Sequence, residues 1–232
     1  AWDRLRNRVV WLALGELGLA YRDSRLKQSL TDAEAGGGRL WGPTGRWVVL
    51  DATFAVRQGS LSSRVAYSQL AGALGVELGE RVPERELREA VLELRRSKGM
   101  VLDDADHDTW SAGSFFTNPI LTTAEAERLP ADAPRFPVTD HSQVVLGTKE
   151  APVVEGLVKT SAAWLIDHAG FTKGFTVEAG APAGLSTKHV LALTNRGGAT
   201  GADLARLRDT VVAGVRERYG ITLVPEPVQV GF

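Results

Sequence analysis

The sequence predicts an α+β fold for a chain of 232 residues. Three observations predict it: apolar residues recur with helical spacing in some segments and as strand-like runs in others, the two kinds of segment do not alternate regularly, and no fixed repeat appears. A chain of this length suffices for one large or two small domains around a sizeable core. We therefore expect a stable globular protein.

Three segments have the apolar periodicity of helices: residues 83–96, 161–169 and 201–219. Pro83 suits the first turn of the first segment, and Gly99 lies just past its end. Thr200 opens the third segment, with Asp203 three residues later, so the two residues form the pattern of a capping box. This third segment is the clearest helix of the chain, because an apolar stripe follows the cap.

Apolar runs predict strands at residues 8–14, 47–56, 190–194 and 221–224, and an extended piece at 227–230. We expect residues 8–14 to be buried, and residues 47–56 to be buried on both faces at first and then on one. Residues 35–45, AGGGRLWGPTG, read as a surface loop. Its glycines do not lie between a strand and a helix, so they are no dinucleotide-binding fingerprint.

The composition excludes several classes of function. Twenty-seven basic and 28 acidic residues give a net charge of -1, which offers no bulk attraction to nucleic acid or to an acidic membrane. Any anionic ligand must be held by a local group of residues. The chain has no cysteine, which excludes disulfides, thiolate nucleophiles and cysteine-ligated metals. A reducing cytoplasm is the default location.

Residues 4–21, RLRNRVVWLALGELGLAY, contain an apolar run, but their pattern is not that of a targeting segment. Basic residues precede it, as in a signal peptide, but Glu16 interrupts it and no small-residue cleavage site follows. It is also too short and too polar to span a membrane.

Two loops have residues that suit a small ligand. Residues 103–108, DDADHD, offer oxygen ligands for a divalent cation, but counted from Asp104 they lack the glycine and the glutamate of an EF-hand loop. A solvated acidic turn is favoured. Residues 195–201, NRGGATG, precede a predicted helix, where free N–H groups can hold a phosphate. Because no Walker lysine follows, a structural turn with Thr200 as N-cap is favoured.

The chemistry-bearing residues give no complete motif by themselves. The histidines, His107, His141, His168 and His189, show no metal-binding spacing and no G-x-S-x-G serine accompanies them, so no metal site is predicted and serine hydrolase chemistry is disfavoured. Ser114 lies in residues 113–119, GSFFTNP, which read as a turn followed by entry into a core. Arg22 alone would be an ordinary surface arginine. Glu226 lies between two prolines that fix the backbone and so aim its carboxylate.

Taken together and in order, six fragments resemble the MurB family of UDP-N-acetylenolpyruvoylglucosamine reductases: residues 21–27, 47–56, 113–119, 161–167, 187–195 and 225–228. The resemblance runs from about Val9 to the C-terminus. Residues 98–119 are most similar to the actinobacterial branch, and Tyr67, in the stretch VAYSQL, resembles a tyrosine loop found in one type of the family.

The resemblance implies a flavoenzyme that completes UDP-N-acetylmuramate for peptidoglycan, with FAD and NADPH as cofactors. In such enzymes NADPH reduces FAD, hydride then reaches the enolpyruvyl double bond, and the enolate-like centre that remains needs a proton. Ser114 matches the family's proton donor. Arg22 and Glu226 match the pair that polarises the substrate carboxylate.

The resemblance also implies binding residues. Tyr67, Lys98 and Asn118 match positions that contact the UDP-sugar, where a lysine meets diphosphate as a point charge. Tyr21, Arg22 and Gly113 match positions on the cofactor side.

The implied domains are the C-terminal part of a FAD-binding domain at residues 1–100, a mixed α/β substrate-binding domain at 101–224, and a segment at 225–232 that returns to the active site. Family members carry a long N-terminal region with most of the FAD-binding loops, and nothing in residues 1–14 corresponds to it. We expect either a piece of a longer enzyme or a shortened relative that has lost the cofactor. The missing segment is then a possible partner, and strands that would pair with it are left with open edges.

The sequence therefore predicts a cytoplasmic enzyme that acts on a UDP-sugar and binds neither nucleic acid nor membrane. Two alternatives remain: a truncated, non-catalytic module that binds UDP-sugar, and a purely structural or interaction domain.

Overall fold

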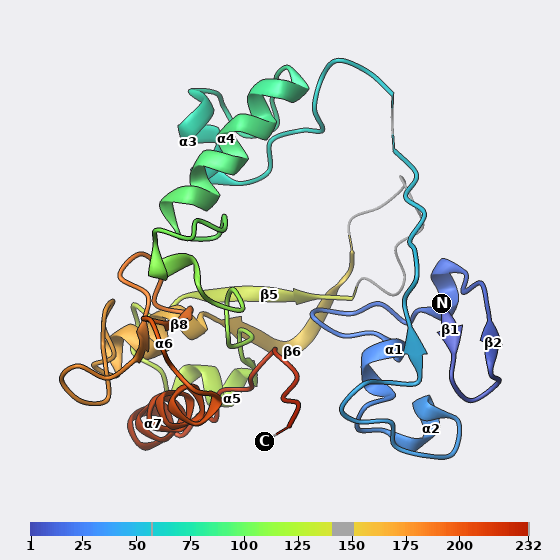
Figure 1. The fold of residues 1–232 in the computed structure, drawn as a ribbon. Helices are drawn as coiled ribbons and strands as arrows, with labels where there is room; N and C mark the ends of the chain where they lie inside the picture. The colour runs from blue at the N-terminus through green and yellow to red at the C-terminus, as the bar shows by residue number, and fades with distance from the viewer. Residues whose placement is uncertain (57, 141–150, 232) are drawn as a thin grey trace. The chain divides into compact units, whose positions relative to one another are not determined.

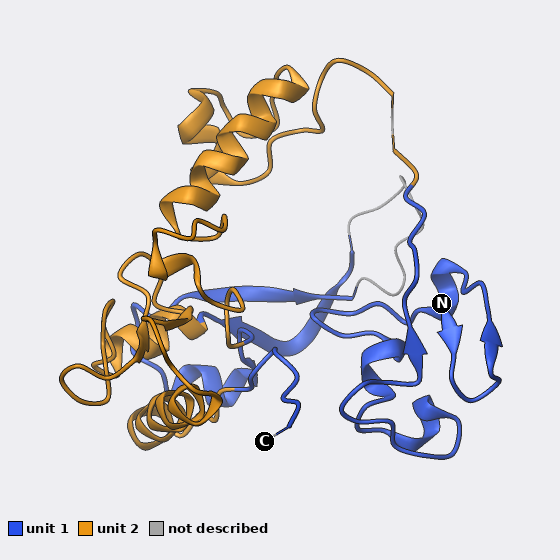
Figure 2. Ribbon diagram, viewed as in Figure 1, with its two compact units in different colours: residues 1–54, 117–161, 224–232 blue, residues 55–116, 162–223 orange. Residues whose placement is uncertain are grey.

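A computed structural model of the chain describes residues 1–56, 58–140 and 151–231. Helices occur together with small antiparallel sheets, so the predicted α+β class is confirmed (Figure 1). The chain forms two compact units, each built from separate segments of the sequence (Figure 2). Unit 1 comprises Ala1–Phe54, Thr117–Ser161 and Val224–Phe232, and unit 2 comprises Ala55–Phe116 and Ala162–Leu223.

The N-terminal part of unit 1 is a small sheet with a buried ion pair. It contains β1 (Trp2–Asp3), β2 (Arg8–Val9) and β3 (Trp47–Val48), a 3-10 turn (Leu14–Glu16), α1 (Arg25–Gln28) and α2 (Ala33–Gly36). The strands are antiparallel, in the order β2-β1-β3. Asp3 is fully buried and accepts hydrogen bonds from Arg46 Nε at 2.9 Å and Nη2 at 2.7 Å. The Arg46 guanidinium lowers the pKa of Asp3 to about 2, although burial opposes the shift.

The two long strands predicted in this region are wrong in extent and in burial. The strand expected at 8–14 is reduced to β2, and the strand expected at 47–56 to β3. Side chains expected inside are exposed: Trp11 by 79%, Phe54 by 80% and Val56 by 84%. The central strand β1 has only two residues, so the paired ladder with each neighbouring strand is two residues long.

The loop at residues 35–45 is more than the surface connection that its glycines predict. Trp41 is buried, and its indole N–H donates to the carbonyl of Gly36 at 2.8 Å. The guanidinium groups of Arg4 and Arg39 lie over the Trp41 ring, at 4.9 and 3.7 Å from the ring centroid. The loop is thus anchored by one aromatic side chain.

A second sheet in unit 1 consists of β4 (Ile120–Thr122), β5 (Arg135–Thr139) and β6 (Val153–Thr160), antiparallel in the order β4-β6-β5. Helix α5 (Thr123–Glu127) follows β4 and begins with a capping box formed by Thr122 and Glu125. The guanidinium of Arg135 donates to carbonyls after this helix, those of Ala126, Leu129, Pro130, Ala131 and Ala133. The sequence did not predict these strands.

A helix pair forms one end of unit 2. It consists of α3 (Ser68–Leu74) and α4 (Glu84–Ser97). Helix α4 confirms the prediction for residues 83–96, with Pro83 as N-cap and Gly99 in the left-handed region at φ 69°. Val65 and Leu70 are buried against apolar residues of α4. A Cβ on Gly99 would lie 2.9 Å from the Asp108 carbonyl oxygen, so only glycine lets the chain pass here.

The rest of unit 2 packs around the long helix α7 (Gly201–Tyr219), with α6 (Ala162–His168), β7 (Ala183–Leu185), β8 (Leu193–Asn195) and a 3-10 turn (His107–Thr109). Both predicted helices are confirmed, and α7 begins with the predicted capping box of Thr200 and Asp203. The fully buried apolar side chains include Leu165, Ile166, Leu185, Leu207, Val211 and Val215. The core of unit 2 therefore lies between α6, α7 and the β7–β8 hairpin.

Three predictions for the C-terminal part are corrected. The strand expected at 190–194 is formed by Leu193–Asn195, and residues 221–224 and 227–230 are not strands. The turn after β8 is structural, as favoured, because Asn195 Oδ1 accepts from the N–H groups of Gly197 and Ala199. Within the described residues, no helix has the length and apolar character needed to cross a membrane.

Candidate functional site

Ser114 lies in a bend that follows a glycine with positive φ and precedes two phenylalanines, of which the second is buried. Gly113 has φ 78°, and its N–H donates to Ser111 Oγ at 3.2 Å. Phe115 N–H donates to the Leu191 carbonyl at 2.8 Å, and Phe116 is 2% exposed. The bend therefore holds the Ser114 hydroxyl outside the core while the next residues enter it.

The Ser114 hydroxyl faces a histidine. Its Oγ lies 3.3 Å from Nε2 of His189, which comes from the other part of unit 2. His189 is half-buried, and burial lowers its pKa, with Lys98 and Lys173 adding to the shift. The ring is therefore neutral near pH 7, with one nitrogen as donor and the other as acceptor.

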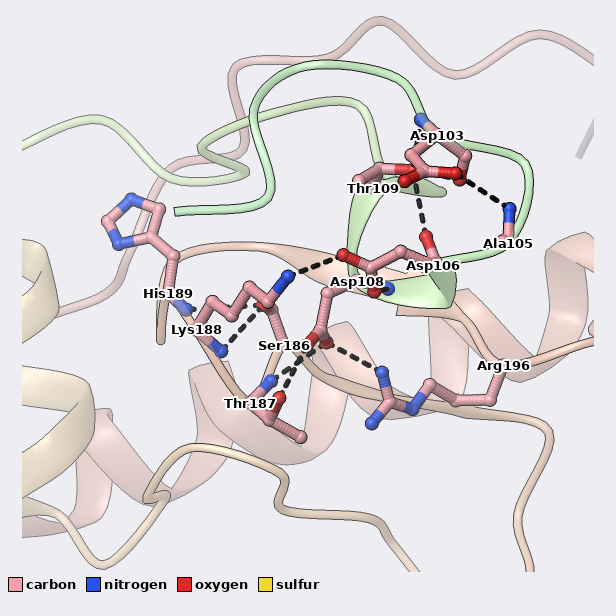
Figure 3. Close-up of polar contacts among 10 residues, drawn as sticks. All are labelled: Asp103, Ala105, Asp106, Asp108, Thr109, Ser186, Thr187, Lys188, His189 and Arg196. Atoms are coloured by element: carbon pink, nitrogen blue, oxygen red, sulfur yellow. Dashed lines mark hydrogen bonds and ion pairs between the residues drawn. The ribbon is translucent and has the colours of Figure 1, made fainter. Parts of the chain in front are cut away.

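A hydrogen-bonded turn positions His189 (Figure 3). Ser186 is fully buried, and its Oγ accepts from the N–H groups of Lys188 at 3.0 Å and His189 at 3.1 Å. The Lys188 ammonium pairs with Asp106 at 2.5 Å. The pairing lowers the pKa of Asp106 and raises that of Lys188. Both ends of the turn are thus fixed by side chains.

The expectation of a solvated acidic turn at 103–108 is wrong for Asp108, whose relative exposure is only 5%. It accepts from Thr187 N–H at 2.9 Å, from the Thr187 hydroxyl, and from Arg196 Nη1 at 2.7 Å (Figure 3). Burial raises the pKa of Asp108, but the hydrogen bonds from Thr187 and Arg196 outweigh it and hold that pKa below its usual value. Its oxygens are used by protein donors, and the described residues contain no group of side chains suited to a metal ion.

The structure brings together Arg22 and Glu226, which the sequence pairs only through the family resemblance. Arg22 Nη1 lies 2.9 Å from Glu226 Oε1, across 204 residues, and both belong to unit 1. Arg22 has φ 53°, in the left-handed region that a non-glycine residue rarely adopts. The Thr117 N–H donates to the Val224 carbonyl at 3.1 Å and so anchors the segment that carries Glu226.

An open pocket of about 410 Å³ is lined by this pair. Ser24 and Lys27 also line it. The Lys27 ammonium donates to the carbonyl of Arg22 at 2.9 Å, which helps to hold the strained residue. Two cationic residues, Arg22 and Lys27, and two carboxylate residues, Asp23 and Glu226, therefore line one pocket.

The predicted binding residues lie at three places. Tyr67 is the N-cap of α3 and is 75% exposed, and Lys98 is the C-cap of α4. The Lys98 ammonium donates to Gln69 Oε1 at 2.8 Å, so Lys98 and the first turn of α3 lie together. Asn118 is half-buried before β4 in unit 1.

On the predicted cofactor side, the Lys159 ammonium lies 4.6 Å from the Tyr21 ring centroid. A Cβ built on Gly113 would have no heavy atom within 4 Å, so the backbone there is open. The roles of these residues stay predictions.

Sequence reasoning missed His189 and Asp108 as parts of a site. The histidines, His189 among them, are interpreted from the sequence only as metal ligands or as the base of a G-x-S-x-G serine, and His141 lies outside the described residues. The useful signal was the order of hydroxyl and basic residues in 186–189, STKH, but its meaning depends on Ser114, which is 75 residues away in sequence.

Comparison with known proteins relates this α+β chain to a class of reductases. Residues 104–230 match the model of a family described as UDP-N-acetylenolpyruvoylglucosamine reductase, C-terminal domain. The chain is 48% identical to the UDP-N-acetylenolpyruvoylglucosamine reductase of Cutibacterium acnes, over 99% of this chain and 53% of that protein. It is 50% identical to the reductase of the same name from Streptomyces avermitilis, over 100% of this chain and 58% of that protein.

The chain belongs to the UDP-N-acetylenolpyruvoylglucosamine reductase family, as the resemblance of its motifs predicted. It is thus related to oxidoreductases. The chain spans about half the length of the curated relatives it matches, 53% of the first and 58% of the second.

Proposed function

We propose that the protein serves in the cytoplasmic, FAD-dependent reduction of UDP-N-acetylglucosamine enolpyruvate to UDP-N-acetylmuramate with NADPH, a step of peptidoglycan precursor synthesis. The observation that carries the proposal is the Arg22–Glu226 pair, which joins two distant segments at a pocket and includes a strained arginine. Strained backbone of this kind is concentrated at functional sites. The relatives with this printed name support the same reaction.

In this proposal Ser114 is the proton donor to the enolate-like carbon. A serine hydroxyl is a weak acid, so it acts only toward a strongly basic intermediate in a site shielded from water. Bound FAD, once reduced by NADPH, would supply the hydride. The chain enters the core two residues later, where Phe116 is buried.

Arg22 and Glu226 would act on the substrate carboxylate. One guanidinium nitrogen of Arg22 donates a hydrogen bond to Glu226. The remaining N–H groups can bind a second carboxylate in the bidentate geometry that arginine favours. The Arg22 charge offsets that of Glu226, which would otherwise oppose the negative charge that develops on the substrate.

The binding residues follow from the same proposal. Tyr67, Lys98 and Asn118 would contact the UDP-sugar. Within the described residues no carboxylate pairs with Lys98, whose ammonium bonds a neutral amide, so its charge is available to a diphosphate. Tyr21, Arg22 and Gly113 would contribute to the FAD site, and the open space at Gly113 fits close approach of a ligand to the backbone.

The remaining flavin contacts would come from a segment that corresponds to the other half of the relatives. We propose residues 1–100 as the C-terminal part of the FAD-binding domain, 101–224 as the substrate-binding domain and 225–232 as the segment that returns to the active site. A second candidate is a UDP-sugar-binding module without turnover, because the chain matches only 53% to 58% of its relatives' length. The visible spectrum of the purified chain after FAD addition and desalting separates the two, since only a flavin holoenzyme keeps the absorption band.

The proposal is tested by Ser114→Ala in a hybrid that places the N-terminal part of the Cutibacterium acnes relative before this chain. We expect flavin reduction by NADPH to stay unchanged and substrate-dependent flavin reoxidation to fall by about 100-fold or more, since a positioned general acid contributes about that much. Both rates are followed by anaerobic stopped-flow absorbance. Ser60→Ala, which removes an exposed hydroxyl elsewhere in unit 2, is the matched control. Equal reoxidation rates in Ser114→Ala and the parent would refute the role.

A further inference from the structure

The contact between Ser114 Oγ and His189 Nε2 admits two opposite arrangements of hydrogen. If Nε2 has no hydrogen, the hydroxyl donates to the ring, and the serine oxygen becomes a nucleophile, as in hydrolases. If Nε2 carries the hydrogen, the ring donates to the oxygen, and the hydroxyl hydrogen is free to point elsewhere. The first arrangement suits acyl transfer, and the second suits a proton donor.

The surroundings of His189 favour the second arrangement. A histidine that accepts a proton from serine needs a carboxylate to orient it and to stabilise the imidazolium. Within the described residues no carboxylate bonds to the His189 ring, and the charged groups that act on the ring are Lys98 and Lys173, both positive. Two nearby cations oppose formation of a third.

We propose that His189 is a positioning residue for Ser114: its neutral ring carries hydrogen on Nε2, donates it to Ser114 Oγ, and leaves the hydroxyl hydrogen directed at the substrate. This inference rests on the proposed role of Ser114. As the Ser114 O–H bond breaks, a C–H bond forms on the substrate, and the alkoxide keeps the hydrogen bond from His189. After the product leaves, water supplies the proton that restores the hydroxyl.

The turn at 186–189 is built to hold the ring in this place. Ser186 fixes the backbone N–H of His189, and Asp108 fixes Thr187 two residues before it. Because Asp108 is also bonded to Arg196 next to β8, the turn is tied to the hairpin core. A preorganised donor of this kind stabilises charge without rearrangement at the moment of reaction.

The hydrogen-bond arrangement is tested on this chain by long-range ¹H–¹⁵N NMR of the histidine rings between pH 6 and 8. We expect His189 to show a protonated Nε2 and a bare Nδ1 at pH 7 and above, and its signals to shift in Ser114→Ala. The exposed His168, which stacks on Trp164, is the internal control and should not respond to Ser114→Ala. A protonated Nδ1 with a bare Nε2, an imidazolium at pH 7, or a His189 signal that ignores Ser114→Ala would overturn the inference.

Kinetics of the hybrid enzyme separate positioning from a structural role. We expect His189→Ala to lower substrate-dependent flavin reoxidation about 10- to 100-fold at saturating substrate, with KM little changed. His189→Gln should recover much of the rate, because its amide N–H can donate from nearly the same place. A purely structural role would instead lower the melting temperature of both variants alike. If His189→Ala reoxidises at the parent's rate, the inference fails.

The two proposals fail in different ways. If NMR shows hydrogen on Nε2 but the parent hybrid does not reduce the UDP-sugar, the proposed function fails and the Ser114–His189 pairing stands.

Discussion

Unit 1 contains two arginine–carboxylate pairs with similar contact distances and different surroundings. Arg46 and Asp3 are 2.7 Å apart, with side chains 6% and 1% exposed. Arg22 and Glu226 are 2.9 Å apart, with side chains 54% and 29% exposed. The first pair has two parallel hydrogen bonds, and the second has one.

The burial of the first pair fits a role in stabilising the fold, and the exposure of the second fits the ligand-binding role proposed for it. Asp3 also accepts hydrogen bonds from the backbone N–H groups of Leu5 and Arg6. Its removal therefore leaves these two N–H groups and the buried Arg46 guanidinium without their acceptor. An exposed pair contributes little to stability. The backbone of Arg22 is strained besides, at a cost of about 1 kcal/mol or more. A strained residue in a weak pair is better explained by function than by stability.

Removal of the buried carboxylate should have the largest effect. We expect Asp3→Ala to lower the free energy of unfolding by about 3 to 5 kcal/mol, because Arg46 is left as an uncompensated buried charge. Urea denaturation of the chain measures the change. Asp51→Ala, at an exposed site in the same unit, is the matched control and should stay within about 0.5 kcal/mol of the parent. A loss below 1 kcal/mol for Asp3→Ala would remove the distinction between the pairs.

The second-largest effect should be the loss of folding stability in acid, where the buried Asp3–Arg46 pair is weakened. The pKa of Asp3 is about 2 in the folded chain, against 3.8 for an unperturbed aspartate, so the unfolded chain binds the proton more tightly. The stabilisation is complete above about pH 4 and is lost as the pH falls through about 2, which amounts to roughly 2 kcal/mol. Urea midpoints measured from pH 5 to pH 2 report it. The same series in Asp3→Asn should lack this component, and an identical acid slope in both proteins would contradict the assignment.

The strain at Arg22 should give the smallest change. We expect Arg22→Gly to be more stable than Arg22→Ala by about 1 kcal/mol, because glycine adopts φ 53° without a Cβ penalty. Thermal and urea unfolding of the two variants measure the difference, and Asp23→Gly against Asp23→Ala controls for glycine at a neighbouring site. If alanine were the more stable residue at position 22, the backbone there would not be strained.

The helices could be predicted from the sequence because their signals are local. Helices α4, α6 and α7 each have an apolar stripe, and α7 also has its capping box within four residues. The strands could not be predicted in the same way, because a strand forms only where another segment, often distant in sequence, supplies backbone hydrogen-bond partners. Residues 49–56 are as apolar as a buried strand, yet β3 ends at Val48, and β6 finds its partners β4 and β5 across long connections.

The site residues likewise fall into those that could be predicted from the sequence and those that could not. Ser114, Arg22 and Glu226 were identified through motifs that resemble a family, and the structure shows that Arg22 meets Glu226. His189 and Asp108 had no motif of their own, since their meaning depends on contacts across 75 and 79 residues. The sequence predicts an exposed Asp108 because the four other polar residues of 103–108 suggest solvent, whereas Thr187 and Arg196 provide enough donors to bury it.

Arg135 ties the second sheet of unit 1 to the turn before β5. Its guanidinium donates to the carbonyl of Ala126 at the end of α5 and to four carbonyls in the turn that follows. Arg135 is also the first residue of β5 and pairs with Thr160 of β6. One residue thus couples the geometry of a local turn to a strand pairing between distant segments.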